Sequence, residues 1–217
     1  MKIKTCEIFT KIADEAKSFF KHSPPTHDWS HTQRVVALCE KLGGEEKADQ
    51  EILLASSFLH DIGRERADRE KICHAELSAK LALPILKQVN FPEEKINDVI
   101  HCISTHRFRG DNPPQTLEAK ILFDADKLDA IGAIGICRAY SYAGENHQPL
   151  YTSFDKEYEL TKIVDHSQHS PVVEFKVKLS KIINTLYTKS GRRMAEHRHK
   201  FMVEFFNEIF EEIKGIK

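Results

Sequence analysis

The sequence predicts an all-α protein. Apolar residues recur at intervals of three and four through most of the 217 residues, and this spacing places them on one face of a helix. No segment shows the strict apolar–polar alternation that is typical of a half-buried strand. Gly43-Gly44, Pro92 and Pro113-Pro114 fall at borders between the periodic segments. Helices are therefore expected over residues 4–22, 31–42, 47–62, 72–88, 93–106, 115–130, 132–143, 172–189 and 193–214.

Local signals predict where some of these helices begin and end. Ser30 followed by Gln33 forms a capping-box pattern, which is expected to open the helix over 31–42. Gly43-Gly44 is expected to end that helix, because glycine tolerates the left-handed conformation that follows many helices. Polar loops are predicted over 143–154 and 165–171, and loops of that length on a helical scaffold often cover a site.

The composition excludes several classes of function. The formal net charge is −1, so a domain-wide basic surface for nucleic acid is absent and no stable nucleic-acid partner is expected. No apolar run reaches the roughly 20 residues of a membrane span, and charges interrupt the N-terminal segment, so a cytoplasmic location is predicted. The five cysteines are odd in number and include no Cys-x-x-Cys pair, which argues against a disulfide framework and a thiolate zinc site.

Two histidines and one aspartate stand at the ends of apolar helices. His31 shares a helix face with Val35, Leu38 and Leu42, so its side chain is predicted to point inward. The helix over 47–62 is apolar on most sides, which predicts that His60 and Asp61 end a buried helix. An ionised aspartate there costs several kcal/mol unless it is paired or bound to a metal.

Two further inward positions follow from the same periodicity. His106 closes an apolar stripe of the helix over 93–106, and Asp126 shares one face with Ala119, Leu122 and Ala130. Each residue alone has an ordinary alternative as a satisfied core side chain or a cap. Together they form a mixed imidazole–carboxylate set, which suits a hard or borderline divalent ion and leaves positions open for water.

The order His31, His60-Asp61, Asp126 resembles the HD superfamily of metal-dependent phosphohydrolases. The surrounding segments resemble a bacterial and archaeal subgroup of single-domain HD hydrolases, one branch of which hydrolyses nucleoside triphosphates to monophosphate and pyrophosphate. These segments are HDWSHTQRV (27–35), FLHDI (58–62), EAKILFDADKLDAIGAIG (118–135) and GRRMAEHRHKFM (191–202). The resemblance spans about residues 25–212. It implies one HD-domain helical bundle over 1–217, with a core over about 25–145 and a C-terminal extension of helices over about 155–214 packing on that core.

The resemblance implies a metal centre made of His31, His60, Asp61 and Asp126. One divalent ion is expected, with Mn, Mg, Co, Ni or Fe as candidates. Members of the subgroup resemble one-metal enzymes, but His74 and His106 stand where binuclear relatives place extra histidines, which leaves room for a second ion.

The implied reaction is hydrolysis of phosphate esters or anhydrides, with a small phosphorylated molecule, most simply a nucleotide, as substrate. Asp61, Glu65 and Lys127 are the expected catalytic residues, with Glu65 orienting water or protonating the leaving group and Lys127 meeting the charge on phosphorus. Contacts to the substrate or to the metal ligands are expected from His27, Arg34, Arg64, His74, His106, Arg107 and Asp129.

Two other functions stay open on the sequence alone. The first is a di-iron oxygenase, because some relatives with this fold hold two irons and oxidise small molecules. The second is a non-catalytic metal-binding or ligand-sensing module. The basic run Arg192, Arg193, His197, Arg198, His199 and Lys200 is interpreted as a solvated helix face, with contact to distal phosphates as the alternative. The oligomeric state is not predicted.

Overall fold

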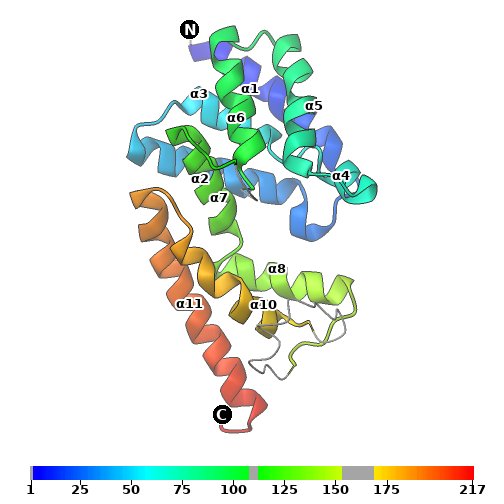
Figure 1. Cartoon of the computed structure of the whole chain (residues 1–217), viewed down its shortest axis with the longest axis vertical. Helices are drawn as coiled ribbons and strands as arrows, with labels where there is room; N and C mark the ends of the chain where they lie inside the picture. Colours follow the sequence, from blue (N-terminus) through cyan, green and yellow to red (C-terminus); the bar gives the residue numbers. More distant parts are fainter. Residues whose placement is uncertain (1, 108–111, 153–168) are drawn as a thin grey trace. The chain divides into compact units, whose positions relative to one another are not determined.

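The structure is a computed structural model that describes residues 2–107, 112–152 and 169–217, with side chains from residue 7 onward (Figure 1). Every regular element in these ranges is helical, which confirms the predicted all-α class. None of these helices has both the length and the apolar character that crossing a membrane requires. The elements, with η for 3₁₀-helices, are α1 (Lys2–Lys17), η1 (Ser18–Phe20), η2 (Pro25–His27), α2 (Trp29–Glu46), α3 (Gln50–Leu59), α4 (Arg64–Glu70), α5 (His74–Gln88), α6 (Glu93–Thr105), α7 (Leu117–Asp129), α8 (Gly132–Glu145), α10 (Pro171–Val177), η3 (Leu179–Asn184) and α11 (Lys189–Ile213).

The chain forms two compact units. The first comprises Met1–Asp126 with Tyr187–Gly191, and the second comprises Lys127–Leu186 with Arg192–Lys217. The core predicted over 25–145 therefore extends beyond the first unit. Helix α8 belongs to the second unit, where it packs against α10. The predicted single domain, with residues 155–214 packing on the core, stays a prediction.

Helix α3 lies at the centre of the first unit. It packs against α1, α2 and α6, and α6 in turn packs against α5 (Figure 1). Leu53, Ala55 and Leu59 are fully buried, as expected for a helix that is apolar on most sides. The chain that leaves the last turn of α3 therefore starts in the interior, and His60 and Asp61 are its first two residues.

Helix α2 begins two residues earlier than predicted. Its cap is Asp28, whose side chain accepts a hydrogen bond from the backbone N–H of His31 over 3.1 Å. Ser30 is inside the helix, and its hydroxyl donates to the Asp28 carboxylate. The predicted capping box at Ser30 is therefore wrong. A carboxylate satisfies the same free N–H groups and also interacts with the positive end of the helix dipole.

The prediction that Gly43-Gly44 ends α2 is also wrong. The helix continues to Glu46 and ends at Lys47, which has a left-handed backbone (φ 60°) and donates its N–H to the Gly43 carbonyl. Gly43 instead serves the packing of α2 on α3, because a Cβ at this position would collide with the side chains of Gln50 and Leu53.

Two other ranges differ from the predicted helices. Helix α4 was not predicted, because Ala67 is its only buried residue and leaves no apolar periodicity to detect. The helix predicted over 172–189 is divided into α10 and η3. Leu179 and Ile182 are both buried, but a spacing of three suits an α-helix and a 3₁₀-helix equally. The predicted loop over 143–154 starts within α8, and the parts of the two predicted loops and of the C-terminal helices that fall on 153–168 lie outside the described residues.

Asp124 joins α7 to the segment that opens α11. Its buried carboxylate accepts hydrogen bonds from the backbone N–H groups of Tyr187 (2.9 Å) and Thr188 (2.8 Å) and from the Thr188 hydroxyl (2.6 Å). Gly191 lies against the same carboxylate, with no room for a Cβ. These contacts hold the last turns of α7, and with them Asp126, against a segment more than 60 residues later in the chain.

Asp124→Ala is expected to lower the free energy of unfolding by about 3–5 kcal/mol, because three buried donors lose their acceptor at once. Urea denaturation of the full chain measures the effect. Asp14→Ala, which removes an exposed aspartate of α1, is the matched control and should change stability by less than about 0.5 kcal/mol. An Asp124 variant as stable as this control would contradict the assigned role.

The second unit contains a stacked aromatic pair and a half-buried acid. Phe175 of α10 stacks on Phe206 of α11 with ring centroids 4.3 Å apart. Glu174 accepts hydrogen bonds from His169 (3.1 Å) and Lys178 (2.6 Å). Burial on its own raises the pKa of Glu174, but these two partners outweigh burial and lower the pKa from its usual 4.5 to about 2.

This shift predicts a pH-dependent contribution to stability. Because the pKa of Glu174 is lower in the folded state, the unfolded chain binds the proton more tightly, and the ionised form stabilises the fold. The stability difference between wild type and Glu174→Gln should be complete above about pH 4.5 and shrink as the pH falls towards 2. Urea denaturation across this range measures it, and a difference that grows on acidification would contradict the assignment.

Candidate metal centre

Three of the predicted ligands meet in the first unit. His31 comes from the first turn of α2, His60 follows α3, and Asp126 lies near the end of α7. One potential ligand atom from each lies within 4.8 Å of the other two. Nε2 of His31 is 3.3 Å from Nε2 of His60 and 3.5 Å from Oδ1 of Asp126. We call these residues the first cluster.

Asp61 connects the first cluster to a second one. Its Oδ2 lies 3.8 Å from Nε2 of both His31 and His60. Its Oδ1 lies 3.4 Å from Nε2 of His74 and 3.5 Å from Nε2 of His106. Asp61, His74 and His106, which are all buried, form the second cluster. The two oxygens of one carboxylate therefore face two different pairs of imidazoles.

Backbone carbonyls orient two of these imidazoles. Nδ1 of His60 donates to the Ser57 carbonyl over 2.7 Å, and Nδ1 of His106 donates to the Ile103 carbonyl over 2.6 Å. A neutral imidazole with its proton on Nδ1 presents a lone pair on Nε2. Burial is the main cause that lowers the pKa of His60 to about 4, so this ring is neutral near pH 7. His60 therefore presents Nε2 as an acceptor towards the first cluster.

The donor atoms of the first cluster suit a divalent cation. Burial on its own raises the pKa of the Asp61 carboxyl, but the Arg64 guanidinium and the neighbouring histidines together outweigh burial and hold that pKa well below its usual range. Oδ2 of this ionised group faces the first cluster, whereas Oδ1, which faces the second cluster, is buried and makes no hydrogen bond with the described residues. Acceptor atoms 3.3–3.8 Å apart are spaced as they would be around one ion with bonds of about 2.0–2.2 Å.

Two arginines stand beside the clusters. The Nε of Arg64 donates to Oδ2 of Asp61 over 3.0 Å, and its Nη1 lies 3.2 Å from Nδ1 of His74. Arg107, at the end of α6, places its Nη1 2.9 Å from the same Nδ1. Both arginines were predicted to contact the substrate, and they bring positive charge to within hydrogen-bonding distance of the centre.

The other predicted residues are placed as follows. The His27 ring lies edge-on to His31 with centroids 5.7 Å apart. Arg34 donates to the Ser30 hydroxyl, and Glu65 is half-buried in the first turn of α4. Lys127 and Asp129 belong to the second unit, where the Asp129 carboxylate accepts a hydrogen bond from Arg138 over 2.9 Å. The roles predicted for these residues stay predictions.

The basic run of α11 is only partly the solvated face that was expected. Arg193, His197 and Lys200 are exposed. Arg198 is half-buried and donates to the Leu128 carbonyl near the end of α7, so the prediction is wrong for this residue. The guanidinium satisfies one of the carbonyls that the end of a helix leaves without a partner.

Sequence reasoning missed the residues that set the position of His60 and Asp61. The turn after Asp61 lies close to α5: Gly63 donates its N–H to the Ser78 hydroxyl over 2.9 Å, and a Cβ on Gly63 would lie 2.7 Å from the Ser78 nitrogen. The glycine directly after His-Asp-Ile was the available signal. Only a residue without a side chain permits this approach, which faces Asp61 towards His74 at the start of α5.

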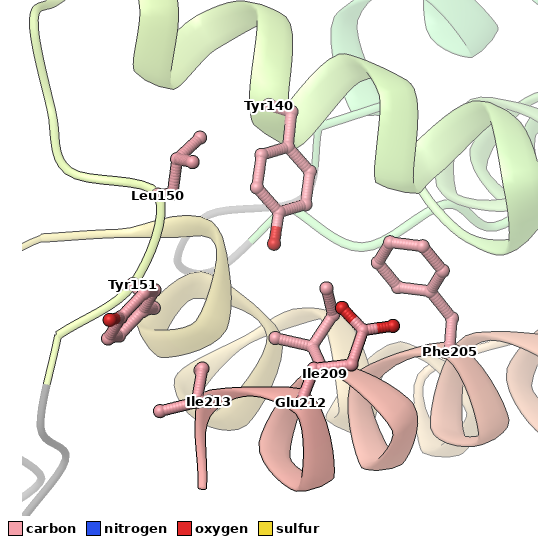
Figure 2. Close-up of a pocket in the computed structure, with 7 residues that line it drawn as sticks. All are labelled: Tyr140, Leu150, Tyr151, Phe205, Ile209, Glu212 and Ile213. Atoms are coloured by element: carbon pink, nitrogen blue, oxygen red, sulfur yellow. The ribbon is translucent and has the colours of Figure 1, made fainter. Parts of the chain in front are cut away.

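A separate pocket of about 540 Å³ lies in the second unit. Figure 2 shows Tyr140 of α8 facing Phe205 and Ile209 of α11 across it. Its lining is aromatic and aliphatic apart from Glu212, and none of its residues belongs to either cluster. Among the described lining residues only Glu212 carries a carboxylate, so this pocket is separate from the candidate metal centre.

Comparison with known proteins agrees with this geometry. The family model described as HD domain matches residues 28–131, a range that contains both clusters. YpgQ of Bacillus subtilis (strain 168) is 32% identical over 195 residues, which cover 88% of this chain and 86% of YpgQ. The chain belongs to the HD superfamily. As an HD-superfamily protein it is a metal-dependent hydrolase.

Two solved structures resemble the HD chain over nearly its whole length. A crystal structure of B. subtilis YpgQ in complex with ADP has a TM-score of 0.75 and 27% identity, and covers 98% of both chains. A predicted HD-superfamily hydrolase from an uncultured Thermotogales bacterium has a TM-score of 0.65 and 31% identity, and covers 95% of this chain and 91% of its own.

Proposed function

We propose that this HD protein is a phosphohydrolase that cleaves phosphate anhydrides or esters of nucleotides with one divalent metal ion held by His31, His60, Asp61 and Asp126. The observation that carries the proposal is the convergence of these side chains, whose ligand atoms come from α2, the end of α3 and α7. When bound, a divalent ion polarises a phosphoryl oxygen and lowers the pKa of a water molecule to about 7, so that hydroxide is available near neutral pH.

The chain's own residues supply the remaining functions. Arg64 and Arg107 place positive charge within hydrogen-bonding distance of Asp61 and His74, and they are the groups proposed to bind the phosphate oxygens as charge develops on them. The Asp28 cap holds the start of α2, from which His31 projects, and the Ser57 carbonyl holds the His60 ring in place. Glu65 and Lys127 keep their proposed roles in proton transfer and charge neutralisation.

Nucleotides are favoured as the substrate class for two reasons. The first is that the relative YpgQ, which is 32% identical and similar over nearly the full length of this chain, has been crystallised with ADP. The second is the charge of the proposed centre. Phosphate anhydrides suit the proposed centre, because two guanidiniums beside a cation can neutralise a phosphate chain of high negative charge.

A panel of nucleoside mono-, di- and triphosphates with Mn²⁺, Co²⁺, Ni²⁺ or Mg²⁺ tests the proposal. Phosphorus NMR of the products identifies the bond that is cleaved. We expect metal-dependent hydrolysis of at least one nucleotide class by the wild type and by His197→Ala, which removes an exposed histidine of α11. A protein that binds metal and leaves every nucleotide and a generic phosphodiester intact would refute the proposed activity.

A further inference from the structure

The two clusters differ in how their imidazoles are protonated. In the second cluster, the Nδ1 of His74 is contacted by both arginine side chains, Arg64 at 3.2 Å and Arg107 at 2.9 Å. A guanidinium carries hydrogen-bond donors and no acceptor. Nδ1 of His74 therefore accepts, and the single proton of the neutral ring is on Nε2.

The contact between His74 and His106 fits this assignment. Their Nε2 atoms are 3.3 Å apart. Nδ1 of His106 donates to the Ile103 carbonyl, which leaves the His106 Nε2 with a lone pair. His74, whose proton the two guanidiniums place on Nε2, can therefore donate it to this lone pair. Its Nε2 also lies 3.4 Å from Oδ1 of Asp61, the buried oxygen that makes no hydrogen bond with the described residues.

The first cluster differs at the outer nitrogen of its ring. Nδ1 of His60 faces the Ser57 carbonyl and not a guanidinium, so its Nε2 keeps a lone pair, which points towards Nε2 of His31 and Oδ2 of Asp61. A second cation at the other cluster would need a lone pair on the His74 Nε2, and the ring would then have to carry its proton on Nδ1, directly against two guanidiniums. Two positive charges within hydrogen-bonding distance of His74 also repel a divalent ion.

We propose that Arg64 and Arg107 are positioning residues that hold His74 with its proton on Nε2, so that this proton occupies the place a second metal ion would need beside Asp61 and His106. The inference rests on the proposed metal centre and adds to it. The centre then takes one ion, and the Nε2 proton of His74 lies between His106 and Oδ1 of Asp61. Removing both guanidiniums frees Nδ1 and allows His74 to become a ligand.

Long-range ¹H–¹⁵N correlation spectra of the full chain, labelled with ¹⁵N-histidine, test the protonation directly. They are recorded without metal and with one equivalent of diamagnetic Zn²⁺, and His74→Asn assigns the resonance. We expect a proton on Nε2 of His74 and on Nδ1 of His60 and His106. A His74 ring with its proton on Nδ1 would overturn the inference whatever the activity of the protein.

Metal counting tests the consequence. Mass spectrometry after equilibration with excess Mn²⁺ and gel filtration should find one ion per chain in the wild type and two in Arg64→Met/Arg107→Met. Arg66→Met, which removes an exposed arginine paired with Glu70 on the same helix, is the matched control and should hold one ion. Circular dichroism checks that the variants are folded.

The outcomes separate this inference from the proposed function. Two ions in the wild type would overturn the inference and leave the metal centre standing. No ion in the wild type would overturn the proposed function, while the spectra still decide the protonation of His74. A folded double variant that holds one ion would show that the arginines do not exclude the second cation. If the double variant does not fold, the spectra of the wild type alone decide.

Discussion

Asp61→Ala is expected to abolish metal retention and turnover together. The side chain presents one oxygen to His31 and His60 and the other to His74 and His106. Its removal deletes one of the four proposed metal ligands and the carboxylate that the two histidine pairs share. We expect kcat/KM to fall by more than about 10³, which corresponds to about 4 kcal/mol of transition-state stabilisation. Steady-state kinetics and metal analysis of the same preparation measure both effects.

Two matched variants control this experiment. Asp14→Ala removes an exposed aspartate of α1, and His197→Ala removes an exposed histidine of α11. Both should keep the metal content and turnover of the wild type. If Asp61→Ala also kept wild-type metal content and turnover, the assignment of the centre would be wrong.

Chelation of the metal is expected to stop hydrolysis and to lower the melting temperature. A ligand at 100 times its Kd stabilises the folded state by about 2.7 kcal/mol, which amounts to roughly 5–10 °C for a chain of this size. Scanning fluorimetry with and without chelator measures the shift, and added Mn²⁺ should restore both properties. Because Asp61→Ala lacks a ligand, its melting temperature should not respond to metal. Unchanged turnover after complete metal removal would contradict a metal-dependent reaction.

Helical periodicity was sufficient to predict the burial of most of the clusters. His31 was placed on the face of Val35 and Leu38, and all three are buried. His60 and Asp61 were placed at the end of a buried helix, and both are buried there. This succeeds because the period of a helix determines the direction of each side chain once the apolar face is known.

Local rules failed where two signals competed. Ser30 and Asp28 are both good caps, and the sequence pattern favoured the serine, although the carboxylate of Asp28 makes the contact. Gly43 was interpreted as a helix end, although it permits α2 to pack closely on α3. The choice of cap is made within the first turn of α2 itself. The role of Gly43 depends on side chains of α3, which the sequence of α2 does not contain.

The sequence by itself determined the helical class, the inward side chains and the chemistry of the ligands, because each follows from residue type and spacing along one helix. Only the tertiary structure decided which of these side chains meet. Asp61 turns its two oxygens to different histidine pairs, and Arg64 and Arg107 meet at one nitrogen of His74 although they are separated by a whole helical hairpin. Such contacts depend on how α3, α5 and α6 pack. Which nitrogen of a histidine donates and which accepts is decided by the groups that lie beside it in space, and these groups are distant in the sequence.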